Sequence, residues 1–237
     1  MSGSTAFFGA STGVGLSALK TTLTSSRTCT ALCRKPAKLT SLLPTSPNLS
    51  VIQGNIYDKA AVTTCIKAAN GTMVDEILFT IGSGFSMSNM GMEDAHVCEN
   101  GITVVLDAIA DLRRAGVAGN PHIVVFSSTG ISKFGRDIPA LMVPFYYALK
   151  TPHEDKVALE NKVAASGASF TIVRASLLVN GESKKTVRVG LEDPKHGVES
   201  KAIGYTISRE DAGKWVAQNL VLEKKLRYVN KTATITY

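Results

Sequence analysis

The sequence is poor in cysteine and histidine, and it contains no long apolar run. Its four cysteines form no CxxC pair and have no histidine at zinc-ligand spacing, so we expect no metal site and a reducing compartment. No stretch reaches the roughly 18 apolar residues that a membrane span needs, and the first residues lack the basic region of a secretory signal. These absences predict a cytoplasmic protein that does not associate with membranes.

Clusters of like charge are also absent, although the formal net charge is +7. Lysines and arginines are scattered, with no run of five or more, which argues against a nucleic-acid partner. The 237 residues are 44% hydrophobic and 19% charged, which is typical of one α/β domain with a sizeable core. We expect a small-molecule substrate and a monomer or homodimer.

Strand-like and helix-like segments alternate from end to end. Buried strands are predicted at residues 5–8, 28–32, 49–53, 76–81, 122–126 and 170–173, with an edge strand at 232–236. The main helices are predicted at 14–25, 59–70, 92–116 and 151–166, with a last helix after 208–211. This order predicts a single Rossmann-type, doubly wound domain over residues 1–237 with a mainly parallel sheet. We expect the Gly-, Lys- and Glu-rich stretch at about 180–206 to cover the ligand crevice.

A glycine-rich turn lies between the first strand and the first helix. Residues 9–15 read Gly-Ala-Ser-Thr-Gly-Val-Gly. Glycines allow the chain to turn tightly, and the free N–H groups of the following helix attract a phosphate. A glycine cluster can be a structural turn only, but this position favours a dinucleotide site.

The residues after the second strand indicate which dinucleotide is bound. An NAD site usually has an acidic residue there, which accepts hydrogen bonds from the ribose 2′-hydroxyl. Here Arg34 and Lys35 follow Cys33, and no acid lies within several residues. Both could be ordinary surface charges, but a guanidinium beside an ammonium suits a 2′-phosphate. We therefore predict NADP(H) as the cofactor.

Several segments together resemble the short-chain dehydrogenase/reductase superfamily, and specifically its atypical, NmrA-like NAD(P)-binding branch. The similar segments are the glycine turn, residues 54–58, 80–82, 127–128, 172–176 and 208–212, so the resemblance covers nearly the whole chain. Thr12 departs from the glycine spacing of the atypical branch, Asn55 replaces an acid and Ala175 replaces a proline. The resemblance implies cofactor contacts from Gly9, Ser11, Thr12, Gly13, Val14, Gly15, Arg34, Lys35, Asn55, Ile56, Thr80, Ile81, Gly82, Ser127, Lys156, Ala175 and Leu177.

The catalytic residues are less clear from the sequence. The superfamily's active enzymes use a serine with a YxxxK motif, and Tyr146 and Lys150 have that spacing. However, Pro152 suggests that Lys150 lies just before the next helix. Counting back from Arg174 makes Lys156 the equivalent lysine instead, which puts Pro152 in the tyrosine position.

We therefore predict the candidate catalytic residues Ser128, Tyr146, Lys150 and Lys156. Ser128 could hydrogen-bond a substrate oxygen or merely cap a loop. Of the four histidines, only His153 is expected near the nicotinamide end, and a capping or surface role is the alternative interpretation.

These features favour an NADP(H)-dependent oxidoreductase that transfers hydride to or from a small carbonyl or quinone-like substrate. Two alternatives stay open at this point. One is a non-catalytic regulator of the NmrA type that senses NADP(H). The other is an isomerase or dehydratase that uses the cofactor fold.

Overall fold

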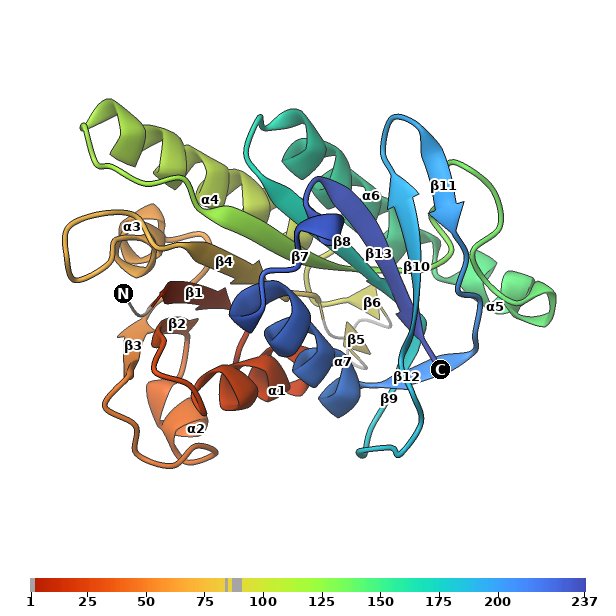
Figure 1. Ribbon diagram of the computed structural model, residues 1–237, viewed down its shortest axis with the longest axis horizontal. Coiled ribbons are helices and arrows are strands. Elements are labelled where there is room, and N and C mark those ends of the chain that lie inside the picture. The colour runs from red at the N-terminus through yellow and green to blue at the C-terminus, as the bar shows by residue number, and fades with distance from the viewer. Residues whose placement is uncertain (1–2, 84, 87–90) are drawn as a thin grey trace.

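The computed structural model describes residues 3–83, 85–86 and 91–237. Within them the main sheet has nine strands in the order β11-β10-β13-β8-β7-β4-β1-β2-β3 (Figure 1). These strands are β1 Ser4–Phe8, β2 Thr28–Cys33, β3 Leu49–Gln53, β4 Glu76–Phe79, β7 His122–Ser128, β8 Phe170–Ala175, β10 Arg188–Asp193, β11 Gly197–Ser200 and β13 Lys231–Thr236. Two small sheets pair β5 Phe85–Ser86 with β6 Gly91–Met92, and β9 Leu177–Val179 with β12 Thr206–Ser208.

The helices are α1 Gly13–Thr22, α2 Pro36–Thr40, α3 Lys59–Ile66, α4 Val97–Arg114, α5 Val143–Ala148, α6 Lys150–Ala165 and α7 Arg209–Val216. The chain after α7 continues as a π-helical segment, Ala217–Leu222, and single 3₁₀ turns lie at Ala140–Met142 and Leu226–Tyr228. No helix formed by the described residues has the length and apolarity needed to cross a membrane.

Helices cover both faces of the sheet, as a parallel sheet requires. One apolar core lies between the sheet and α3, α4 and α6, and it includes Phe79, Ile102 and Leu159. The other lies between the sheet and α1 and α7, and it includes Phe7 and Trp215. Figure 1 shows the two helical layers on opposite sides of the strands. The Rossmann-type, doubly wound prediction is confirmed.

The sheet is wound outward in two directions from its centre. From the centre, β1, β2 and β3 follow one another toward one edge of the sheet, and β4, β7, β8 and β13 follow one another toward the other edge. All seven strands are parallel. The direction changes between β1 and β4. In such sheets the loops diverge at this point, so a crevice opens at the carboxyl ends of the two strands.

The longest helix, α4, illustrates how the sequence specifies its layer. Its buried side chains recur every three or four residues, from Cys98 through Ile102 and Val105 to Leu112. Glu99 lies in the first turn and arginines lie in the last turn, which matches the helix dipole. Gly116 then adopts a φ of +76°, which ends the helix.

The structure corrects one prediction about the carboxyl-terminal third. The last strand, β13, is not an edge strand, because it lies between β8 and β10. The reason is that the stretch at about 180–206 forms β10 and β11, which add two antiparallel strands beyond β13. The expected covering of the ligand crevice by this stretch stays a prediction.

Three helix boundaries also differ from those predicted. Helix α4 begins at Val97 rather than residue 92, because β6 occupies Gly91–Met92. Helix α3 ends at Ile66, and Lys67 pairs instead with Met73 in an isolated bridge. Helix α6 includes Lys150 as its first residue, so this lysine does not lie before the helix. Pro152 is compatible with that start because the first N–H groups of a helix have no intrahelical acceptor.

Candidate active site

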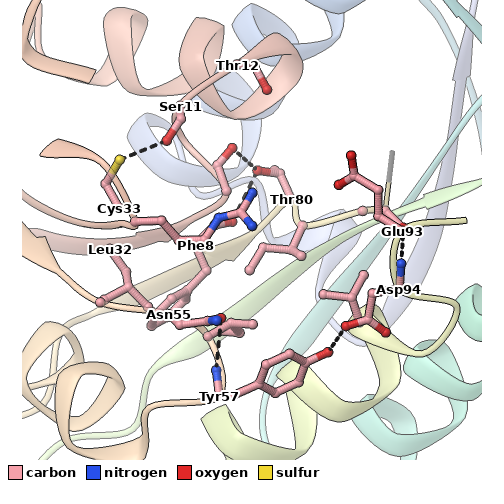
Figure 2. A pocket seen from close by; sticks show the side chains of 18 residues that line it. Phe8, Ser11, Thr12, Leu32, Cys33, Asn55, Tyr57, Thr80, Glu93 and Asp94 are labelled. Carbon is pink, nitrogen blue, oxygen red and sulfur yellow. Dashed lines mark hydrogen bonds between the residues drawn. The ribbon is translucent and has the colours of Figure 1, made fainter. Parts of the chain in front are cut away.

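A cavity of about 430 Å³ opens at the carboxyl ends of β1, β2, β3 and β4, where the winding of the sheet reverses. Figure 2 shows its wall, with Phe8 at the end of β1, Thr80 directly after β4, and Ser11 and Thr12 from the glycine turn. The Thr80 hydroxyl donates to the carbonyl oxygens of Phe8 and Gly9, each at 3.2 Å. This bond joins the ends of β1 and β4 at the base of the cavity.

The glycine turn fits closely against β4. Gly9 has a φ of +99°, a conformation that residues with a side chain rarely adopt. A Cβ atom on Gly15 would lie 2.3 Å from the carbonyl oxygen of Gly9 and 2.4 Å from Thr80 Oγ1. Neither position can therefore carry a larger residue without moving the turn.

Helix α1 points its amino terminus toward this turn. Its first intrahelical hydrogen bond is donated by Leu16 to the carbonyl of Thr12 at 3.2 Å, so the preceding N–H groups have no acceptor within the helix. The Thr12 side chain caps none of them, and the first turn contains no acid. The partial positive charge of the helix end is therefore available to an anion in the cavity.

The end of β2 contributes an exposed cation and a buried thiol. Arg34 and Cys33 both line the cavity. Cys33 Sγ lies 3.1 Å from Ser11 Oγ and donates to the carbonyl of Lys35 at 3.2 Å (Figure 2). Lys35 is exposed and is not among the lining residues. The structure thus separates the two predicted cations, and Arg34 is the one at the cavity.

The opposite rim is formed by the loop after β3 and the segment before α4. Asn55, Ile56 and Tyr57 line the cavity there, together with Asp94. The Tyr57 hydroxyl donates to the Asp94 carboxylate (Figure 2). Desolvation and this hydrogen bond raise the pKa of Tyr57, so the phenol stays protonated. Asp58, in the same loop, accepts from two N–H groups and caps α3.

Lys156 connects the cavity with the neighbouring strand end. Its Nζ atom donates to the carbonyl oxygens of Ile81, at 3.0 Å, and Phe126, at 2.8 Å. These carbonyls follow β4 and lie within β7, so the ammonium bridges the ends of two adjacent strands. An ammonium has three donors, and these two bonds use two of them.

A second polar group lies at the end of β7. Ser128 Oγ is 3.5 Å from His153 Nε2, and it donates to the carbonyl of Thr129 at 3.1 Å. The His153 ring stacks against Tyr146 with a centroid distance of 5.6 Å and an interplanar angle of 28°. Burial lowers the pKa of His153 below its ordinary value of 6.5. His153 and Lys156 are three residues apart on α6, so both side chains leave the same face of the helix.

The predicted pair of Tyr146 and Lys150 is not brought together. Tyr146 is only 5% exposed, and its hydroxyl lies 3.0 Å from Thr129 Oγ1. The Lys150 side chain is 76% exposed, and its ammonium lies 3.7 Å from the Glu154 carboxylate. Burial is the main cause that raises the pKa of Tyr146, and no cation is bonded to it to reverse that shift.

Not all of the predicted cofactor residues reach the cavity. The lining includes Gly9, Ser11, Thr12, Arg34, Asn55, Ile56, Thr80, Ile81 and Gly82. Gly13, Val14 and Gly15 form the first turn of α1 behind it. Lys156, on α6, lies outside the lining, as do Ser127, Ala175 and Leu177 on or just after β7 and β8. The buried Ser127 hydroxyl has no hydrogen-bond partner among the described residues.

Several residues of this region could not be identified from the sequence. Tyr57 and Asp94 were not predicted, and neither was Thr129. His153 was expected near the site but given a capping or surface role. Its spacing from Lys156 was the available signal, because residues three apart on a helix share a face. Nothing in the sequence brings Asp94 to Tyr57, which lies far earlier in the chain.

The cavity fits an extended nucleotide cofactor. It combines a turn that excludes Cβ atoms, a free helix amino terminus and a cation at the end of β2. A pyrophosphate would meet the glycine turn, and a phosphate on the adenosine ribose would meet Arg34. Lys156 lies toward the other end, beside β7.

Comparisons with known proteins agree with this geometry. A protein-family model described as NAD(P)H-binding matches residues 9–222. The chain is 34% identical to the reductase pytE of Aspergillus terreus, over 98% of this chain and 97% of that protein. It is 28% identical to the oxidase pynE of Aspergillus niger, also over 98% and 97%.

The fold is shared with solved structures of low sequence identity. A short-chain dehydrogenase/reductase from Veillonella parvula, solved in complex with NADP, matches with a TM-score of 0.75 at 13% identity. The match covers 100% of this chain and 95% of the other. At this identity the likeness describes the fold alone.

Proposed function

The chain belongs to the NAD(P)H-binding family and is an oxidoreductase, and on that premise we propose that it is an NADPH-dependent reductase of a carbonyl compound. The reacting oxygen would lie at the end of β7, beside Ser128 and His153. The observation that carries this proposal is the 3.5 Å approach of Ser128 Oγ to His153 Nε2, close to the lysine that bridges β4 and β7.

The cofactor preference rests on Arg34. It lines the cavity where β2 ends, the place at which a dinucleotide fold meets the adenosine ribose. A guanidinium offers several N–H donors to phosphate oxygens, whereas an acid there would repel them. Glu93 and Asp94 also line the cavity, but they come from the segment before α4 rather than from the end of β2.

Lys156 would position the cofactor's second ribose and the reacting ring. Its two bonds to backbone carbonyls fix the ammonium between β4 and β7. The third donor interacts with the Cys98 thiol and could instead bond a ribose hydroxyl of the cofactor. This role requires no tyrosine four residues earlier, where Pro152 lies.

Ser128 and His153 would supply the proton. NADPH, when bound, supplies the hydride. As the carbon–hydrogen bond forms at the carbonyl carbon, the π electrons move to the oxygen. Ser128 donates its proton to that oxygen and takes one from the His153 imidazolium. The product is an alcohol, and solvent returns a proton to His153.

The direct test is consumption of NADPH, followed by its absorbance, with a panel of aldehydes, ketones and quinones. We expect oxidation of NADPH with at least one carbonyl acceptor, and a loss of about a hundredfold or more in kcat for His153→Gln. Lys162, on the same helix, pairs with Glu99 at 3.6 Å and lines neither the cofactor cavity nor the α5–α6 surface, so Lys162→Gln is a matched control that should keep wild-type activity. Tight NADPH binding without turnover of any acceptor would contradict the proposal.

A further inference from the structure

A second cavity, of about 550 Å³, lies between α5 and the first half of α6. Its walls include Ile131, Ile138, Val143 and Val157, so most of its surface is apolar. Pockets of this size enclose ligands as large as drugs. Figure 1 shows α5 at the end of the molecule that lies away from β1, β2 and β3. The cavity is therefore distinct from the one at the glycine turn.

His153 connects this cavity with the reaction centre. Its side chain lines the cavity, while its Nε2 atom faces Ser128. Tyr146 lines the same wall and stacks on His153. A molecule in the cavity would thus contact the ring whose other side faces the reacting group.

The aromatic wall is held rigidly. A Cβ atom on Gly130 would lie 2.5 Å from Tyr146 Cδ1, so the backbone of this turn packs directly on the tyrosine ring. The hydroxyl of Tyr146 is held by Thr129 at 3.0 Å. Tyr146 is only 5% exposed, so it backs the wall, and the accessible aromatic ring of the lining is that of Tyr147, which is 84% exposed. An aromatic face favours a flat apolar partner.

The polar groups around the cavity have partners of their own. Lys150 and Glu154, the charged residues of its lining, pair with each other at 3.7 Å and are both exposed. The side-chain oxygen of Asn161 accepts from Lys133 at 2.9 Å. Apart from His153 at the reaction centre, the lining therefore provides apolar contact and no unpaired charge, which suits an uncharged molecule.

We propose that the substrate is a bulky, uncharged and mainly apolar carbonyl compound, whose body occupies this cavity and whose carbonyl group points toward Ser128 and His153. This inference rests on the proposed function. It assigns the cavity between α5 and α6 as the specificity site. In this assignment Tyr146 forms part of the cavity wall and does not donate a proton to the substrate.

A graded series of methyl ketones tests the size requirement. We expect kcat/KM to rise about tenfold from acetone to acetophenone and again to 2-acetonaphthone, because each ring adds buried apolar area. The carboxylate of 4-acetylbenzoic acid should react at least about tenfold less well than its methyl ester, because its charge has no partner in the cavity.

A substitution that fills the cavity between α5 and α6 tests whether the body of the substrate binds there. Ala158 lines the cavity, and Ala158→Phe should reduce kcat/KM for 2-acetonaphthone by about tenfold more than for acetone. Ala164 is exposed farther along the same helix and lines neither cavity, so Ala164→Phe is the matched control and should leave both values unchanged. Binding of 2-acetonaphthone by the protein, measured by calorimetry, should weaken in the first variant only.

The outcomes separate this inference from the proposed function. Reduction of acetone and 2-acetonaphthone with equal kcat/KM, or an Ala158→Phe variant that binds 2-acetonaphthone as tightly as wild type, would overturn the cavity assignment while leaving the reductase intact. Binding of 2-acetonaphthone that Ala158→Phe weakens, without oxidation of NADPH, would support the cavity and contradict the reductase.

Discussion

Arg34→Glu is the perturbation that most sharply tests how the cofactor is selected. Arg34 lines the cavity at the end of β2, and no other cation of the neighbouring loop does. Hydrogen bonds to charged groups contribute about 1.5–3 kcal/mol. Because Arg34 is exposed, we expect the lower half of that range, which corresponds to a loss of about ten- to fortyfold in NADPH affinity. NADH lacks the 2′-phosphate, so its affinity should change by less than about threefold.

The neighbouring lysine provides a control with the same change in charge. Lys35 is exposed but does not line the cavity, so Lys35→Glu should weaken NADPH binding by no more than about threefold. Calorimetric titration of both variants with NADPH and NADH at one ionic strength measures the four constants. The reasoning is refuted if Arg34→Glu leaves the NADPH constant unchanged, or if it weakens NADPH and NADH equally.

Three further predictions concern the turn, the fold and the proton. Gly15→Ala places a Cβ atom 2.3 Å from the Gly9 carbonyl, so it should lower NADPH affinity more than about tenfold, and unchanged titrations would contradict the tight turn. Asp155 is buried and accepts from the first N–H groups of α4 at 3.0 and 2.8 Å, so Asp155→Ala should lower the free energy of unfolding in urea by about 1–3 kcal/mol. The exposed Glu154→Ala is its control, and equal midpoints for the two variants would refute the capping role. Burial lowers the pKa of His153, and its protonated form is the proposed donor, so kcat should fall as pH rises through a value below 6.5; a kcat that rises with pH over that range would contradict this assignment.

The cofactor half of the site could be predicted because its determinants are local in sequence. The glycine turn follows the first strand directly, and Arg34 follows the second, so their places were fixed once the βα alternation was recognised. The membership of the NAD(P)H-binding family confirms the resemblance that these segments carried. Of the two adjacent cations only Arg34 lines the cavity, and the sequence could not distinguish it from Lys35.

The proposed reaction centre could be predicted only in part: Ser128 was a candidate, but its pairing with His153 joins distant segments. Tyr146 and Lys150 have the expected spacing, but a break between α5 and α6 separates them, and the tyrosine bonds to Thr129. The proposed role of His153 depends on its contact with Ser128, which lies on a strand twenty-five residues earlier. Likewise, β13 is interior only because β10 returns beside it.

The central claim is that Ser128 and His153, rather than Tyr146 and Lys150, deliver the proton to the reacting oxygen. Single-turnover oxidation of NADPH in the presence of an accepted ketone measures this step directly. We predict that Ser128→Ala and His153→Gln each slow it by about a hundredfold or more, whereas Tyr146→Phe, which keeps the ring, slows it by less than about tenfold. A hundredfold loss in Tyr146→Phe together with near wild-type rates in His153→Gln would contradict the account.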